Sequence, residues 1–177
     1  NNGYEVHVAS NGEEELLHVD KKHNIPFERS PFKTNNIKAY KQLKKLIEAN
    51  DYKLVHCHTP MGGAIARLAS ISARKRGLKV LYTAHGFHFY KGAPKKNWLI
   101  YYPVEKLLSR FTDVLITINE EDYELANKKK FKAHKIEHVR GVGVNFNKFS
   151  PQNCETKQIL RRTYNYPDEA FILVYVG

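Results

Sequence analysis

Histidine side chains lie where two apolar runs of this sequence give way to polar residues. The run of residues 80–84 leads directly into His85, and the run of residues 52–59 contains His56 and His58 near its end. An imidazole donates, accepts and transfers protons near neutral pH, so these positions suit hydrogen-bonding or acid–base chemistry. His85 is therefore the first candidate for a catalytic residue.

The same histidines leave a metal site open as an alternative. His56 and His58 are two residues apart and share one face of a strand, and His85 and His88 follow along the chain. A zinc ion held by these side chains would make the protein a metal-dependent hydrolase. Because no carboxylate or further ligand follows at a spacing typical of metal sites, we predict no metal here.

Glycines and aromatic residues next to the histidines are candidates for ligand binding. Gly62 and Gly63 open a predicted helix directly after a strand, where bare backbone N–H groups suit an anion or a sugar hydroxyl. Tight packing of helix on strand is the alternative reading. Residues 87–98 mix aromatic side chains with lysines, which favours stacking on bases or sugars, contact with a membrane, or an ordinary surface loop. The candidate substrate-binding residues of this region are Gly86, Phe87, Tyr90 and Lys91.

The elements that must position these residues alternate between strands and helices. Strands are predicted over residues 4–9, 52–59, 78–85, 112–119 and 136–139, with a short extended segment at 25–27. Helices are predicted over residues 36–49, 61–76, 97–111 and 120–130, the third kinked or split by Pro103. This alternation predicts an α/β fold, a Rossmann-like three-layer domain with a mostly parallel sheet. Ligands bind at the carboxyl ends of such strands, where His58, His85 and Asn119 are expected to meet.

The charge of the chain favours anionic partners. It carries 29 Lys and Arg against 18 Asp and Glu, a net charge of +11 over 177 residues. Such a surface attracts nucleic acid, sugar nucleotides or an anionic membrane face. A basic nucleic-acid-binding domain is an alternative that rests on charge alone, because the sequence contains no nucleic-acid module signature.

Cysteine usage and hydropathy indicate a reducing compartment and no predicted membrane span. The two cysteines are Cys57, in a predicted core strand, and Cys154. A disulfide between them is not expected, which favours a cytoplasmic location. No apolar run approaches the roughly 18 residues that a spanning helix needs.

Five motifs, in order along the chain, resemble the N-terminal domain of a glycosyltransferase family 4 enzyme of the bacterial capsular and exopolysaccharide branch. They are LVHCHTPMGG at 54–63, YTAHGFHFYKG at 82–92, YPVEK at 102–106, DVLITIN at 113–119 and GVGVNFNKF at 141–149. Enzymes of this family have two Rossmann-like domains that face each other across a cleft, the GT-B architecture. The resemblance therefore implies that this chain is the N-terminal half of a GT-B glycosyltransferase.

The resemblance also implies a reaction and its site. Such an enzyme moves a sugar, with retention, from a nucleotide sugar (a UDP-sugar is expected) to a lipid-linked saccharide acceptor, without a metal or a cofactor. His85 would be the catalytic residue on the acceptor side, where it hydrogen-bonds the transferred sugar or the acceptor. The other residues expected to line the cleft or approach the donor are Gly62, Gly63, Asn119, Gly141, Gly143 and Asn145.

Partners and domain limits follow from the same resemblance. The partners are a nucleotide sugar, a lipid-linked acceptor and an anionic membrane surface, with no nucleic acid, and the location is cytoplasmic, peripheral on the inner face of the membrane. Residues 1–150 would form the acceptor-side domain, whose first strand and glycine-rich loop would precede Asn1. Residues 151–177 would form a linker helix and, from Ala170, the first strand of a donor-binding domain that follows Gly177. The chain alone is expected to be inactive.

Overall fold

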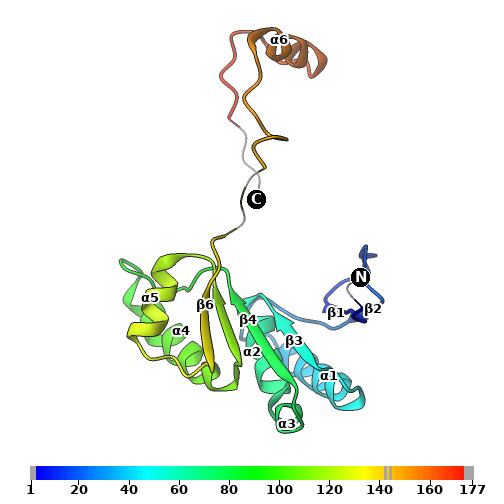
Figure 1. Cartoon of the computed structure of the whole chain (residues 1–177), viewed down its shortest axis with the longest axis vertical. Helices are drawn as coiled ribbons and strands as arrows, with labels where there is room; N and C mark the ends of the chain where they lie inside the picture. The colour runs from blue at the N-terminus through cyan, green and yellow to red at the C-terminus, as the bar shows by residue number, and fades with distance from the viewer. Residues whose placement is uncertain (1–2, 142, 144, 174–177) are drawn as a thin grey trace. The chain divides into compact units, whose positions relative to one another are not determined.

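The computed structural model describes residues 3–141, 143 and 145–173 of the chain (Figure 1). The chain divides into two compact units, residues 1–141 and residues 142–177. The first unit contains the predicted parallel sheet and all of the candidate histidines, so it is described first.

A four-stranded parallel sheet is the centre of the first unit. Its strands are β3 (Leu54–Cys57), β4 (Lys79–Ala84), β5 (Val114–Thr117) and β6 (Lys135–His138), in that spatial order. The register aligns Cys57 with Tyr82 and Ala84 with Thr117, so all four strands end near one rim. The predicted α/β, Rossmann-like fold with a parallel sheet is confirmed.

Helices connect the strands as the sequence pattern requires. They are α1 (Asn35–Ala49), α2 (Pro60–Ala69), α3 (Ile71–Arg74), α4 (Lys95–Leu108) and α5 (Glu120–Lys128), with the 3₁₀ turn η1 (Ser109–Phe111) after α4. Helix α2 contacts both α1 and α4, and α5 packs against β5 and β6 (Figure 1). The predicted helix over 61–76 is interrupted at Ser70 and becomes α2 and α3. Pro103 does not split α4, which is one continuous helix.

A second, two-stranded sheet precedes α1. Strand β1 (His7–Ser10) pairs in parallel with β2 (Lys21–Asn24). The sequence analysis missed β2 and placed an extended segment at residues 25–27 instead. The strand sequence KKHN is polar, and it is held to β1 by backbone hydrogen bonds, which leave no trace in a hydropathy pattern. The apolar residue that the pattern detected, Ile25, is buried just beyond the strand.

The second unit contains one described helix, α6 (Cys154–Thr163). The side chain of Asn153 caps it by accepting a hydrogen bond from the backbone N–H of Thr156 at 2.8 Å. Residues 170–173 are not in a strand, and the rest of the strand predicted from Ala170 lies outside the described residues. In the part of the chain that the structure describes, no helix has both the length and the hydropathy to cross a membrane.

A buried guanidinium joins α2, α4 and β4. The Arg67 side chain is 1% exposed and donates two hydrogen bonds to the carboxylate of Glu105 on α4, at 2.8 and 3.1 Å. Its Nε donates to the carbonyl of Gly63 at 2.9 Å, and its guanidinium carbon lies 4.0 Å from the ring centroid of Tyr82 on β4. A buried charge is tolerated only when it is paired and hydrogen-bonded, so this contact fixes how the three elements pack.

We predict that Arg67→Ala lowers the free energy of unfolding by about 3–5 kcal/mol, because it leaves the Glu105 carboxylate unpaired in a nearly buried position. Urea denaturation of the two proteins measures this difference. Lys44→Ala is the matched control, since Lys44 and Glu48 form an exposed pair on α1, and its effect is expected to stay within about 0.5 kcal/mol. Equal effects of the two substitutions would contradict the role of burial.

Candidate active site at the carboxyl ends of the strands

Three histidines lie in a row at the rim where β3 and β4 end. Nδ1 of His58 lies 3.3 Å from Nε2 of His85, within hydrogen-bonding distance. The rings of His56 and His58 have centroids 4.2 Å apart, and Nε2 of His56 lies 2.9 Å from the Thr83 hydroxyl oxygen. The parallel register of β3 and β4 places these residues together. Gly86 follows at a φ of +148°, a conformation that favours glycine, and turns the chain immediately after His85.

The surroundings of His56 and His58 favour the neutral form of these two rings. Burial, and then the neighbouring His85, lower the pKa of His58, while burial and then His58 lower the pKa of His56. The separation of 3.3 Å between Nδ1 of His58 and Nε2 of His85 allows one ring to donate a hydrogen bond to the other. The contact uses Nε2 of His85, so a ligand would meet that ring at Nδ1.

A buried carboxylate from α5 holds the loop that follows His85. The side chain of Asp122 is 3% exposed, and its Oδ2 accepts from the backbone N–H of Phe87 at 3.0 Å and from the Asn119 amide at 2.8 Å. Asn119 in turn caps α5, because its Oδ1 accepts from the backbone N–H of Asp122 at 2.8 Å. Asn119 thus lies at the end of β5 as expected, but its amide group makes these local contacts. The sequence analysis missed Asp122, whose only signal was its place in the acidic first turn of a predicted helix.

The aromatic residues after His85 divide between core and surface. Phe87 and Phe89 are buried and stack with ring centroids 4.7 Å apart, so the Phe87 ring is used in packing. Tyr90 is exposed, and its carbonyl accepts a hydrogen bond from the indole of Trp98 at 3.3 Å. Lys91 is also exposed, and its backbone N–H donates to Glu121 at 2.7 Å. Of these residues, Tyr90 and Lys91 remain the ones whose side chains face solvent.

The two glycines at the start of α2 serve packing and capping. The backbone N–H of Gly62 donates to the Thr59 hydroxyl at 3.2 Å, and that of Gly63 donates to the Thr59 carbonyl at 2.6 Å. The N–H groups that the sequence analysis expected to be bare are therefore already paired. A Cβ on Gly63 would lie 2.7 Å from the Tyr82 ring, so this position requires glycine for close approach of α2 to β4.

The last three predicted site residues, Gly141, Gly143 and Asn145, are divided between the two units. Gly141 ends the first unit, and a Cβ there would lie 3.4 Å from the carbonyl oxygen of Ile118, next to the end of β5. Gly143 and Asn145 belong to the second unit, where Asn145 accepts hydrogen bonds from the backbone of Asn147 and Lys148. A role for these two residues next to the histidines stays a prediction.

The thiol next to the histidines does not suit a metal. Cys57 points to the opposite face of β3 from His56 and His58, and burial raises its pKa to about 12. Metal-binding cysteines act as thiolates. Over residues 3–141, 143 and 145–173, the structure contains no group of three or more His, Cys, Asp and Glu side chains arranged to hold a metal ion.

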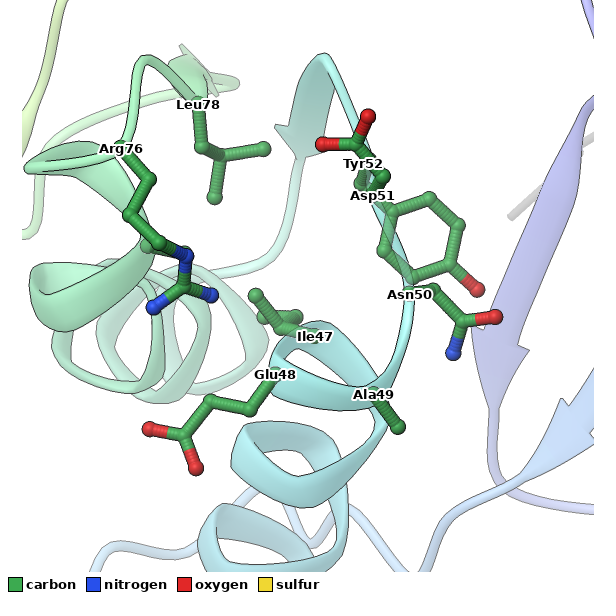
Figure 2. Close-up of a pocket in the computed structure, with 9 residues that line it drawn as sticks. Ile47, Glu48, Ala49, Asn50, Asp51, Tyr52, Arg76 and Leu78 are labelled. Carbon is green, nitrogen blue, oxygen red and sulfur yellow. The ribbon is translucent and has the colours of Figure 1, made fainter.

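A pocket at the other end of the sheet is not part of this site. Figure 2 shows side chains from the end of α1, the segment before β3 and the turn before β4 gathered around it, among them Glu48, Tyr52 and Arg76. These residues lie at the amino ends of the strands. Because ligands of open α/β sheets bind at the carboxyl ends, the histidine rim is the better candidate for a functional site.

A parallel, Rossmann-like sheet with a histidine row at its carboxyl rim defines an α/β domain with a candidate site, and comparison with known proteins gives its family. A sequence profile described as Glycosyl transferase 4-like matches residues 1–119, and the chain belongs to this family. It is 54% identical over 173 residues to a Bacillus subtilis (strain 168) protein named "Putative glycosyltransferase EpsD", covering 98% of this chain and 45% of that protein.

Two further relatives are more distant. An Escherichia coli protein named "UDP-Gal:alpha-D-GlcNAc-diphosphoundecaprenol alpha-1,3-galactosyltransferase" is 32% identical over 117 residues, which cover 66% of this chain and 30% of that protein. A Klebsiella pneumoniae protein named "Uncharacterized 41.2 kDa protein in cps region" is 29% identical over 97 residues, 54% of this chain and 27% of that protein. The chain spans less than half the length of each of these relatives.

We predict that the histidine row makes stability depend on pH. The pKa values of His56 and His58 are lowered in the fold from the ordinary 6.5, so the unfolded chain takes up protons first as the pH falls. The contribution of these two rings to stability is therefore full above pH 6.5 and is lost as the pH falls below it. The urea midpoint of the native protein should drop more between about pH 7.5 and about pH 5.5 than that of His56→Asn/His58→Asn.

The control for this measurement is His18→Asn, at an exposed histidine between β1 and β2. It should keep the pH dependence of the native protein. If the double variant also keeps the full dependence, the two rim histidines are not the groups that titrate.

Proposed function

We propose that this chain is the acceptor-side half of a retaining glycosyltransferase that moves a sugar from a UDP-sugar to a lipid-linked saccharide in capsule or exopolysaccharide synthesis. The observation that carries the proposal is the His58–His85 contact at the carboxyl rim, in a chain that belongs to the glycosyltransferase 4-like family. The name of the Escherichia coli relative, which contains a UDP-sugar and a diphosphoundecaprenol acceptor, supports the choice of substrates.

In this proposal His85 is the catalytic residue and His58 is a positioning residue. Nδ1 of His85 hydrogen-bonds a hydroxyl of the transferred sugar or of the acceptor and so orients the attacking group. The contact with His58 fixes the orientation of the His85 ring and the nitrogen that carries its proton. Asp122 acts one step further away, because it holds the backbone of the loop immediately after His85 and Gly86.

The exposed part of the same loop is suited to an anionic acceptor. Lys91 lies on the surface a few residues after His85, and Lys95 and Lys96 follow at the start of α4. Their charge favours a diphosphate-linked acceptor, with Tyr90 available to pack against a sugar ring. The chain spans 45% of the Bacillus subtilis relative, and in this proposal the remaining length binds most of the donor, so the chain alone is expected to be inactive.

We predict that His85→Ala lowers the transfer rate by about two orders of magnitude, the size expected for loss of a positioning or acid–base contact. The assay uses the longer protein, in which this chain is joined to the remaining length that its relatives have. It scans UDP-sugars against a membrane lipid acceptor and separates kcat from KM.

His134→Ala is the matched control, because His134 is exposed and precedes β6 at the opposite end of the sheet. It should retain full activity. Equal activity of His85→Ala and the native enzyme would overturn the assignment of His85 while leaving the enzyme class in place.

A further inference from the structure

Helix α4 has an outer face that is apolar although it faces solvent. Leu99 is 79% exposed and Leu107 is 53% exposed, which is unusual for leucines in a packed helix. At 100° per residue, these two lie on the same side of the helix as three other exposed residues. We call this set the α4 face: Leu99, Ile100, Pro103, Val104 and Leu107.

Basic side chains border the α4 face, and none of its five residues is acidic. Lys95 and Lys96 are exposed at the start of the helix, and Arg110 is exposed just beyond its end. The acidic residue within the described helix, Glu105, points inward to Arg67. An apolar face with a basic border is typical of a helix that lies in the interface of an anionic membrane.

Other residues in the first two turns of α4 contact the loop of the candidate active site. The side-chain amide of Asn97 donates to the carbonyl of His88 at 2.9 Å, and the rings of Tyr101 and His88 have centroids 4.7 Å apart. The indole of Trp98 donates to the carbonyl of Tyr90. A membrane that contacts α4 would therefore lie next to the loop that follows His85.

We propose that the α4 face docks this domain on an anionic lipid bilayer and so presents the histidine rim to an acceptor held in that membrane. The inference rests on the proposed function for the identity of the acceptor, but the docking itself does not. A second copy of the chain is a less suitable occupant, because two such faces would bring like charges together.

The test is co-sedimentation of the 177-residue chain with lipid vesicles. The vesicles contain phosphatidylcholine alone, or phosphatidylcholine with about one third phosphatidylglycerol, at low and high salt. Binding should require the anionic lipid and weaken with salt. The variant Leu99→Glu/Leu107→Glu should bind at least about tenfold more weakly, because it places two charges where the acyl chains would lie.

The matched control is Leu17→Glu/Phe171→Glu, which adds the same two charges at leucine and phenylalanine side chains that are 88% and 91% exposed outside α4. This control lowers the net charge by the same amount as the α4 variant. It should still bind nearly as well as the native chain, because its added charges lie outside α4. Circular dichroism of both variants checks that they fold. Equal losses in the two variants, or no binding to either vesicle, would overturn the proposal.

Sedimentation velocity without lipid tests the other occupant, a second copy of the chain. If the native chain is a dimer and the α4 variant is a monomer, the α4 face is a dimer interface and the proposal is overturned.

These outcomes separate the docking surface from the enzymatic proposal. Transfer that fails with every UDP-sugar, with α4-dependent binding intact, would leave the docking surface and remove the proposed substrates. If sugar transfer depends on His85 but vesicle binding is unchanged by the α4 substitutions, the enzymatic proposal stands and the docking surface is wrong.

Discussion

The buried ion pair between Arg67 and Glu105 is the constraint on which the arrangement of the first unit depends. A guanidinium inside a protein needs a paired carboxylate and further acceptors, and here Glu105 and the Gly63 carbonyl supply them. Satisfying it brings α2 against α4 and places the guanidinium over Tyr82 of β4. Gly63 permits this approach because a larger residue would contact the Tyr82 ring.

The two surfaces that we propose to be functional follow from the packing of these helices and strands. Because Glu105 must face inward, the opposite side of α4, with Leu99 and Leu107, faces solvent. The end of β3 with His58 lies beside the end of β4 with His85 because these two strands pair in parallel, beneath α2. The outward direction of the α4 face thus depends on the buried pair, and the histidine rim depends on the pairing of β3 with β4.

A second, smaller polar cluster fixes the loop between these surfaces. The Asp122 carboxylate binds the loop backbone and also the Asn119 amide at the start of α5. The stacked Phe87 and Phe89 rings hold the same loop from the core side. Residues that the sequence analysis assigned to substrate binding, Asn119 and Phe87, therefore contribute by positioning the loop, and the exposed Tyr90 and Lys91 remain to meet a ligand.

The sequence by itself determined the α/β class, the strands that carry His58 and His85, and their meeting at one rim, because apolar runs and helical spacing report directly on burial. It missed β2, whose polar residues are held by backbone hydrogen bonds, and it did not anticipate that the N–H groups of Gly62 and Gly63 are already paired. The glycine N–H groups are paired locally, by the cap that Thr59 makes at the start of α2. The tertiary structure alone decided the pairing of β2 and the role of Asp122, because both depend on partners far apart in the chain. The outward apolar face of α4 belongs to the same group: the sequence predicted the helix, and the structure shows that its leucines are exposed while Glu105 faces inward to Arg67.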